Sequence, residues 1–231
     1  MFESLFNYDN PFWRFMGKVG DLLILNFLFL ICSLPLVTFG ASLSALYYSV
    51  FRLYEGKGGG TVAGFFHAFK QNLLQGSLLG IIAAIFGLAL AADFRILHFY
   101  TSAGTLSGSI SFVLGAVMSF AALLYFFVFL YVFPLQARFY NPVRKTLWNA
   151  LLLSLRCLPR TLLILLMDAA LCLLSAAGFV YLPQVCVLLF LLLVPFICLC
   201  NAVLMKNLLQ LVKADDSPAP EYSEEGSGDK P

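Results

Sequence analysis

Five long apolar runs constrain this chain more than any other feature of its sequence. They cover residues 22–39, 73–92, 110–133, 161–181 and 183–205. A helix needs about 20 apolar residues to cross the roughly 30 Å hydrocarbon core of a bilayer. Because lipid cannot hydrogen-bond a bare peptide group, each crossing segment must be helical. The sequence therefore predicts an all-α, polytopic transmembrane helical bundle with about five spans and short interfacial amphipathic helices.

Composition excludes a soluble domain. Of the 231 residues, 61% are hydrophobic and 11% are charged, whereas about 25% of the residues of soluble domains are charged. Residues 1–213 form the predicted membrane domain, with thirteen Lys and Arg residues against six acids. These charges lie between apolar spans without a basic run, so we expect anionic lipid headgroups as the partner and no nucleic acid. Residues 214–231 are rich in Pro, Ser, Gly and acids, which predicts a disordered acidic tail.

Amphipathic stretches flank the apolar runs. Residues 11–18, 65–72 and 135–160 combine aromatic, apolar and basic side chains, which is typical of helices in the headgroup layer. Pro134 is expected to stop the third span, and a polar connector follows the second span at residues 101–109. Residues 41–54 leave two alternatives open: they continue the first helix, or they lie at the interface.

Orientation follows from the basic residues of the connectors. In a five-span arrangement, eleven Lys and Arg residues lie on the side of the C-terminus and three on the other side. The positive-inside rule then predicts a cytoplasmic C-terminus and an extracellular N-terminus. If the short first span is a re-entrant hairpin instead, the N-terminus moves inside.

The first eighty residues carry a distinctive set of residues. It comprises Asn10-Pro11-Phe12, Gly20-Asp21, Asn26, Ser33-Leu34-Pro35, Thr38, Gly40-Ala41, Ala45-Leu46-Tyr47-Tyr48, Phe65, Phe69-Lys70 and Asn72. This set resembles the YesL-like family of bacterial membrane proteins, a family described as a domain of unknown function. The resemblance implies a multi-pass protein of the bacterial cell membrane. It also implies an association with carbohydrate uptake, because such proteins are often encoded near carbohydrate importers and glycan-degrading enzymes.

Asp168 is the candidate intramembrane polar site, because it is the one carboxylate placed well inside a predicted span. A charge at that depth costs a few kcal/mol unless it is paired, protonated or hydrated. Asp168 is therefore either a proton-coupling or substrate-binding group, or a structural group that faces Asn, Ser or Arg on a neighbouring helix. The structural role is favoured.

Weaker candidates lie near the ends of the predicted spans. Asp21 and Asn26 precede or enter the first span, where helix capping is favoured over partner binding. Asp93 and Arg95 follow the second span and form, with His98, either a polar cluster or ordinary interfacial residues.

No cofactor or metal site is predicted. The six cysteines lack the paired spacing of zinc sites, and the two histidines are isolated (Cys32, Cys157, Cys172, Cys186, Cys198, Cys200, His67 and His98). The chain is predicted not to be an enzyme, since no nucleophile with its base is recognisable. The favoured function is a non-enzymatic partner or regulator of carbohydrate uptake that contacts a transporter subunit. The alternative is a small transporter or channel that uses Asp168, for which a homo-oligomer is needed.

Overall fold

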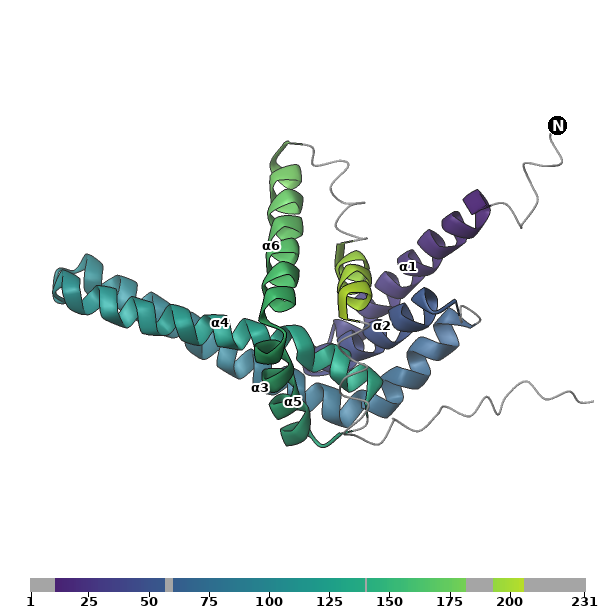
Figure 1. The fold of residues 1–231 in the computed structure, drawn as a ribbon, viewed down its shortest axis with the longest axis horizontal. Helices are drawn as coiled ribbons and strands as arrows, with labels where there is room; N and C mark the ends of the chain where they lie inside the picture. Colours follow the sequence, from purple (N-terminus) through teal and green to yellow (C-terminus); the bar gives the residue numbers. More distant parts are fainter. Residues whose placement is uncertain (1–10, 57–59, 140, 182–192, 206–231) are drawn as a thin grey trace, which may run out of the picture.

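The computed structural model describes residues 11–56, 60–139, 141–181 and 193–205 (Figure 1). The elements are α1 (Pro11–Ser33), a 3-10 turn η1 (Leu36–Thr38), α2 (Phe39–Tyr54), α3 (Thr61–Ser102), α4 (Gly108–Arg138), α5 (Val143–Arg156) and α6 (Leu158–Tyr181), followed by the short helix Leu193–Met205. No strand occurs within these ranges. The predicted all-helical fold is confirmed.

Five helices in the described ranges are long and apolar enough to cross a membrane. Three of them, α3, α4 and α6, contain the predicted spans 73–92, 110–133 and 161–181, and α1 contains residues 22–33 of the first predicted span. The fifth is the η1–α2 segment, Leu36–Tyr54. For residues 41–54 of this segment, the sequence left open whether they continue the first helix or lie at the interface. The predicted span 183–205 lies partly outside the described residues, and its remainder forms the helix Leu193–Met205. The chain is therefore a multi-pass helical membrane protein.

The first predicted span is placed differently. α1 begins at Pro11, so the predicted interfacial stretch 11–18 and the first span are one continuous helix. It ends at Ser33 rather than at residue 39, because Pro35 lacks the N–H that would continue the helix. Thr38 secures the turn, since its hydroxyl lies 2.6 Å from the Cys32 carbonyl oxygen and 2.8 Å from that of Pro35. α2 is therefore a separate helix and does not continue α1.

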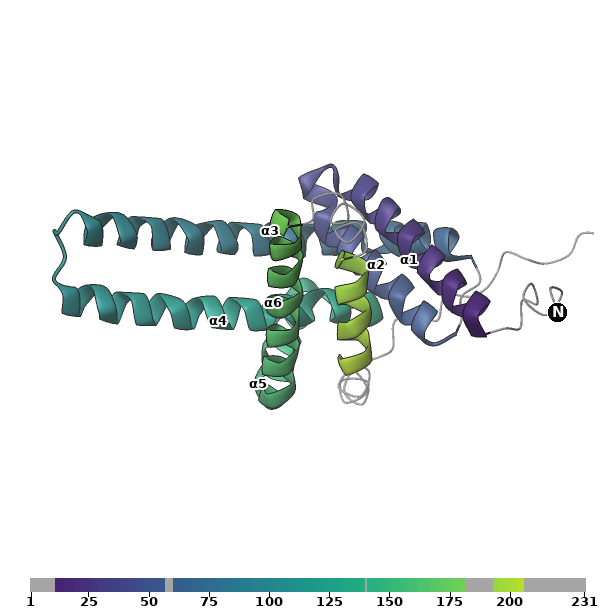
Figure 2. The same cartoon turned by 90° about the horizontal axis from the view of Figure 1, so that it is seen from above.

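Helices α3 and α4 are longer than predicted and form a projecting hairpin (Figures 1 and 2). The 42 residues of α3 correspond to about 63 Å at 1.5 Å per residue, and they include the stretch predicted as a separate interfacial helix. The predicted connector is present but shorter, at residues 103–107 instead of 101–109, with Gly104 at φ 70° in the turn. Pro134 does not stop α4, which continues to Arg138. Pro is tolerated here because neighbouring helices surround residues 133–137.

α5 and α6 run across α4 in both views (Figures 1 and 2). α5 confirms the helix predicted within residues 135–160, and Thr146, Ala150, Leu153 and Ser154 form its buried face. Because α6 also crosses α4, the α3–α4 hairpin and α6 do not share one direction. Each helix is therefore assigned as a candidate span on its own length and composition.

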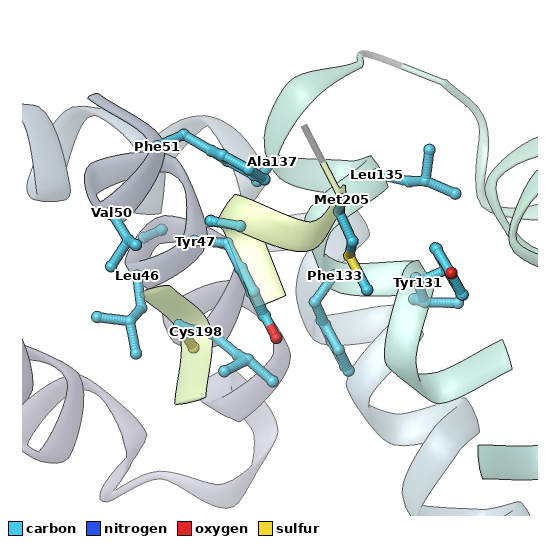
Figure 3. Packing of buried hydrophobic residues seen from close by; sticks show 14 of the residues in the cluster. Leu46, Tyr47, Val50, Phe51, Tyr131, Phe133, Leu135, Ala137, Cys198 and Met205 are labelled. Atoms are coloured by element: carbon cyan, nitrogen blue, oxygen red, sulfur yellow. The ribbon is translucent and has the colours of Figure 1, made fainter. Parts of the chain in front are cut away.

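The hydrophobic core is centred on α2, most of which is buried. In Figure 3 the Tyr47 side chain of α2 points toward Phe133 of α4, Phe51 of α2 lies beside Ala137 of α4, and Met205 of the last helix lies next to Phe133. Because lipid tails are as apolar as these side chains, close van der Waals packing rather than removal from water holds the helices together here. The core therefore joins helices that are far apart in the sequence.

Three glycines allow α2 and α3 to meet backbone to backbone. A Cβ on Gly40 of α2 would overlap the Gly76 carbonyl oxygen and lie 2.9 Å from the Gly80 Cα atom. A Cβ on Gly76 would lie 2.8 Å from the Ala41 Cα atom. Gly76 and Gly80 are four residues apart on one face of α3, the small-xxx-small spacing by which membrane helices approach closely. This glycine seam sets the separation of the two helices.

Candidate functional site

Asp168 lies in a polar cluster formed by three helices. The Asn201 Nδ2 atom, on the last helix, donates to the Asp168 Oδ2 atom of α6 over 3.0 Å. The same Nδ2 atom lies 3.4 Å from the hydroxyl oxygen of Tyr47, on α2. We call Tyr47, Asp168 and Asn201 the Asp168 cluster. Asn is one of the three partner types expected for Asp168 from the sequence, but neither Asn201 nor Tyr47 was predicted as a site residue.

Two oxygen atoms of the Asp168 cluster have no hydrogen-bond partner within the described part of the chain. They are Asp168 Oδ1 and Asn201 Oδ1, and both are buried. An unsatisfied buried polar atom costs about 1–3 kcal/mol. Both atoms are acceptors, so their hydrogen-bonding capacity in the cluster is unused within the described ranges.

A second polar cluster joins α3, α4 and α5. The Gln136 side chain of α4 is buried, and its Nε2 atom donates to Asn72 Oδ1 over 3.1 Å and to Gln75 Oε1 over 2.9 Å. The Thr146 hydroxyl of α5 donates to Gln136 Oε1 over 3.3 Å. Every polar atom of the Gln136 side chain therefore has a partner, and the cluster holds the three helices together.

An ion pair joins the ends of α2 and α4 near this second cluster. The Arg138 guanidinium lies 2.6 Å from a carboxylate oxygen of Glu55 and 4.9 Å from the ring centre of Phe51. Both charged side chains are about one third exposed, so the pair contributes on the order of 1 kcal/mol or less. Its main effect is to fix which helix ends lie together.

Asp21 and Asn26 do not cap a helix, which corrects the favoured prediction. α1 begins at Pro11, so both residues lie in its interior, away from the unpaired N–H groups of the first turn. Asp21 Oδ1 instead accepts a hydrogen bond of 3.0 Å from the Thr61 hydroxyl at the start of α3. Asn26 is buried, and its Oδ1 atom has no partner in the described ranges.

Asp93 and Arg95 do not form a cluster with His98 in the described ranges. All three side chains are exposed on α3, which continues past them to Ser102. The structure records no hydrogen bond or ion pair for Asp93 or Arg95 among the residues it describes. Within the same ranges, no three His, Cys, Asp or Glu side chains lie close enough to share a metal ion.

An apolar groove of about 1260 Å³ separates α5 from the α3–α4 hairpin. Its walls include Leu79 and Phe86 of α3 and Leu124 and Val128 of α4. One end is formed by the first turn of α5, where the lining includes Arg144 and Lys145. None of the residues of the Asp168 cluster lines this groove, so the two features are separate.

The helices and their polar clusters define a multi-pass helical membrane protein. Residues 22–94 match the model of a family described as a protein of unknown function, DUF624. The match covers α2, the second half of α1, most of α3, and the glycine seam, but less than half of the chain. No match was found among curated proteins, and none among solved structures.

Proposed function

We propose that this protein is a non-enzymatic subunit that docks onto another membrane protein through α5. The observation that carries the proposal is an exposed apolar stripe on that helix, formed by Trp148, Leu152 and Leu155. These side chains are 59%, 49% and 43% exposed, and their spacing places them on one helical face. Trp is enriched at the centres of protein interfaces. We call these three residues the α5 stripe.

The nature of the partner rests on the resemblance to YesL-like proteins. Because those proteins are often encoded near carbohydrate importers, we propose a carbohydrate transporter subunit as the partner. The interhelical hydrogen bonds of Gln136 support a role as a fixed scaffold, since they hold the base of α5 against α3 and α4.

Photo-crosslinking in cells tests this docking. A photoreactive amino acid at Leu152 or Leu155 is expected to give a defined adduct that contains a transporter subunit. The matched control is Leu88, which is 70% exposed on α3 but lies on the helix face opposite to Leu79, Phe86 and the other α3 residues that line the groove beside α5. If Leu152 and Leu155 give no adduct, or if Leu88 gives the same adduct, docking through the α5 stripe is wrong.

We further infer that the chain crosses the membrane six times, with both termini in the cytoplasm. The crossings are α1, α2, α3, α4, α6 and the apolar run 183–205. This arrangement places thirteen of the fourteen Lys and Arg residues on the cytoplasmic side and leaves Arg95 on the other side. The five-span arrangement places eleven on one side, so the positive-inside rule favours six crossings.

Reporters for membrane sidedness test the six-crossing arrangement. Fusions at the two termini are expected to report the same, cytoplasmic side. In a variant without native cysteines, a cysteine in place of Val37 or Thr105 is expected to react with a membrane-impermeant maleimide added outside intact cells. An N-terminal reporter on the outer side would restore the five-span arrangement.

A second function, a small transporter or channel that uses Asp168, is favoured by one observation. Asp168 Oδ1 and Asn201 Oδ1 are buried acceptors without a partner in the described ranges, and such a pair suits a proton, a cation or a hydroxyl group of a substrate. Uptake of candidate sugars or ions into proteoliposomes, compared between the wild-type protein and Asp168→Asn, tests it.

A further inference from the structure

The groove between α5 and the α3–α4 hairpin combines apolar walls with a basic end. Its walls belong to segments of α3 and α4 that are candidate membrane spans. Apolar surface of this kind is covered either by another helix or by hydrocarbon. Among the described helices, α5 reaches the groove only at one end and along one side, so the groove is open to an apolar occupant.

The length of the groove matches one leaflet of a bilayer. Its α4 wall extends from Ala121 to Phe133, a rise of about 18 Å at 1.5 Å per residue. Half of a hydrocarbon core is about 15 Å thick. The volume of about 1260 Å³ exceeds the range of roughly 300–1,000 Å³ that is usual for small-molecule pockets. Both quantities suit the acyl chains of one phospholipid.

The charge at the end of the groove suits an anionic headgroup. Arg144 and Lys145 lie in the first turn of α5, and among the residues that the structure describes no acidic side chain lines the groove. The positive end of the α5 helix dipole points to the same place. The groove ends at Phe133 and Pro142, close to where α4 passes from its apolar run to Gln136 and Arg138. Apolar walls therefore meet basic side chains where a leaflet meets its headgroups.

We infer that this groove binds one anionic phospholipid of the cytoplasmic leaflet. Its acyl chains lie along the walls formed by Leu79, Phe86, Ala121 and Val128. Its phosphate group is bound by Arg144 and Lys145. The lipid fills the space between α5 and the hairpin. This site is separate from the Asp168 cluster. It shares Trp148 with the α5 stripe, but Leu152 and Leu155 of the stripe do not line the groove.

Native mass spectrometry of the full-length protein tests the inference. The protein is purified in a mild detergent, delipidated and titrated with phosphatidylglycerol or phosphatidylcholine. One phosphatidylglycerol is expected to bind at least tenfold more tightly than phosphatidylcholine. Each basic side chain near an anionic lipid contributes about fivefold in affinity. The double variant Arg144→Ala with Lys145→Ala is therefore expected to lose about thirtyfold for phosphatidylglycerol and little for phosphatidylcholine.

Two further variants make the result specific to the groove. Arg156→Ala with Arg160→Ala removes the same number of charges beyond the groove and is expected to leave the affinity unchanged within twofold. Ala121→Trp fills the apolar wall and is expected to weaken binding of both lipids while the protein stays monodisperse. Equal binding of the two lipids by the wild-type protein would overturn the inference. An equal loss in the two double variants would also overturn it, because binding would then reflect overall charge and not the groove.

Discussion

Among Gly→Ala substitutions in the described helices, Gly40→Ala is expected to destabilise the protein most. The new Cβ would overlap the Gly76 carbonyl oxygen and lie 2.9 Å from the Gly80 Cα atom. Neither contact can be relieved by a rotamer change, because both atoms belong to the α3 backbone. Overpacking of this kind costs about 1–3 kcal/mol or more. The expected result is a clear fall in the apparent melting temperature of the detergent-purified protein, with loss of the monodisperse peak in size-exclusion chromatography.

A glycine on α4 provides the matched control for this substitution. A Cβ on Gly115 would lie 3.7 Å from the Leu97 Cδ2 atom, an ordinary van der Waals contact. Ala is also preferred to Gly in a helix interior by about 1 kcal/mol. Gly115→Ala is therefore expected to be neutral or slightly stabilising. Equal melting temperatures for the Gly40 and Gly115 variants would show that α2 and α3 are not in backbone contact.

Hydropathy alone was sufficient to predict most of the spans, but it did not resolve α2. The serines Ser42, Ser44 and Ser49 lower the mean hydropathy of this segment. In the structure their hydroxyls donate to the carbonyl oxygens of Thr38, Gly40 and Ala45 at 2.9–3.0 Å. A hydroxyl that bonds to its own helix needs no water. α2 therefore occupies the centre of the core despite its polar sequence.

The ends of the helices were less predictable than their apolar centres, because contacts between helices decide them. Asp21 and Lys18 mark the polar limit of the first apolar run, yet α1 extends back to Pro11. Asp21 is accommodated because Thr61 of α3 donates to it over 3.0 Å. No local pattern indicates a partner forty residues away. The same limit applies to Pro134, whose tolerance depends on the helices packed around it.

The depth of Asp168 was visible in the sequence, but the identity of its partners was not. Asn201 could have been proposed, since it is the one asparagine in the apolar run 183–205. Tyr47 gave no such signal, because it lies on a helix that was not recognised as a candidate span and is separated from Asn201 by 154 residues. A search of every apolar run for polar partners of the deep carboxylate would therefore have found Asn201 but not Tyr47.

Substitutions at Asp168 separate a structural cluster from a transport site, because Asn and Leu have opposite consequences for Asn201. In Asp168→Asn the new amide keeps an oxygen for the Asn201 Nδ2 donor and adds an N–H₂ group for the unpartnered Asn201 Oδ1 atom. Asp168→Leu removes the 3.0 Å hydrogen bond and offers no replacement. An interhelical hydrogen bond in a membrane contributes about 0.6–2 kcal/mol. Asp168→Asn is therefore expected to be as stable as the wild-type protein or more stable, and Asp168→Leu to be less stable by about 1–2 kcal/mol.

If Asp168 only holds α6 against the last helix, each Asp168 variant is expected to lose function only as far as it loses stability. Under the docking proposal, Asp168→Asn keeps wild-type crosslinking at Leu152, while Asp168→Leu loses it in proportion to the folded protein that is lost. A transporter would respond differently, because an amide cannot carry a proton or the charge that attracts a cation. Proteoliposome flux that is present in the wild-type protein and falls at least tenfold in a fully stable Asp168→Asn variant would therefore reject the structural role and establish the transporter.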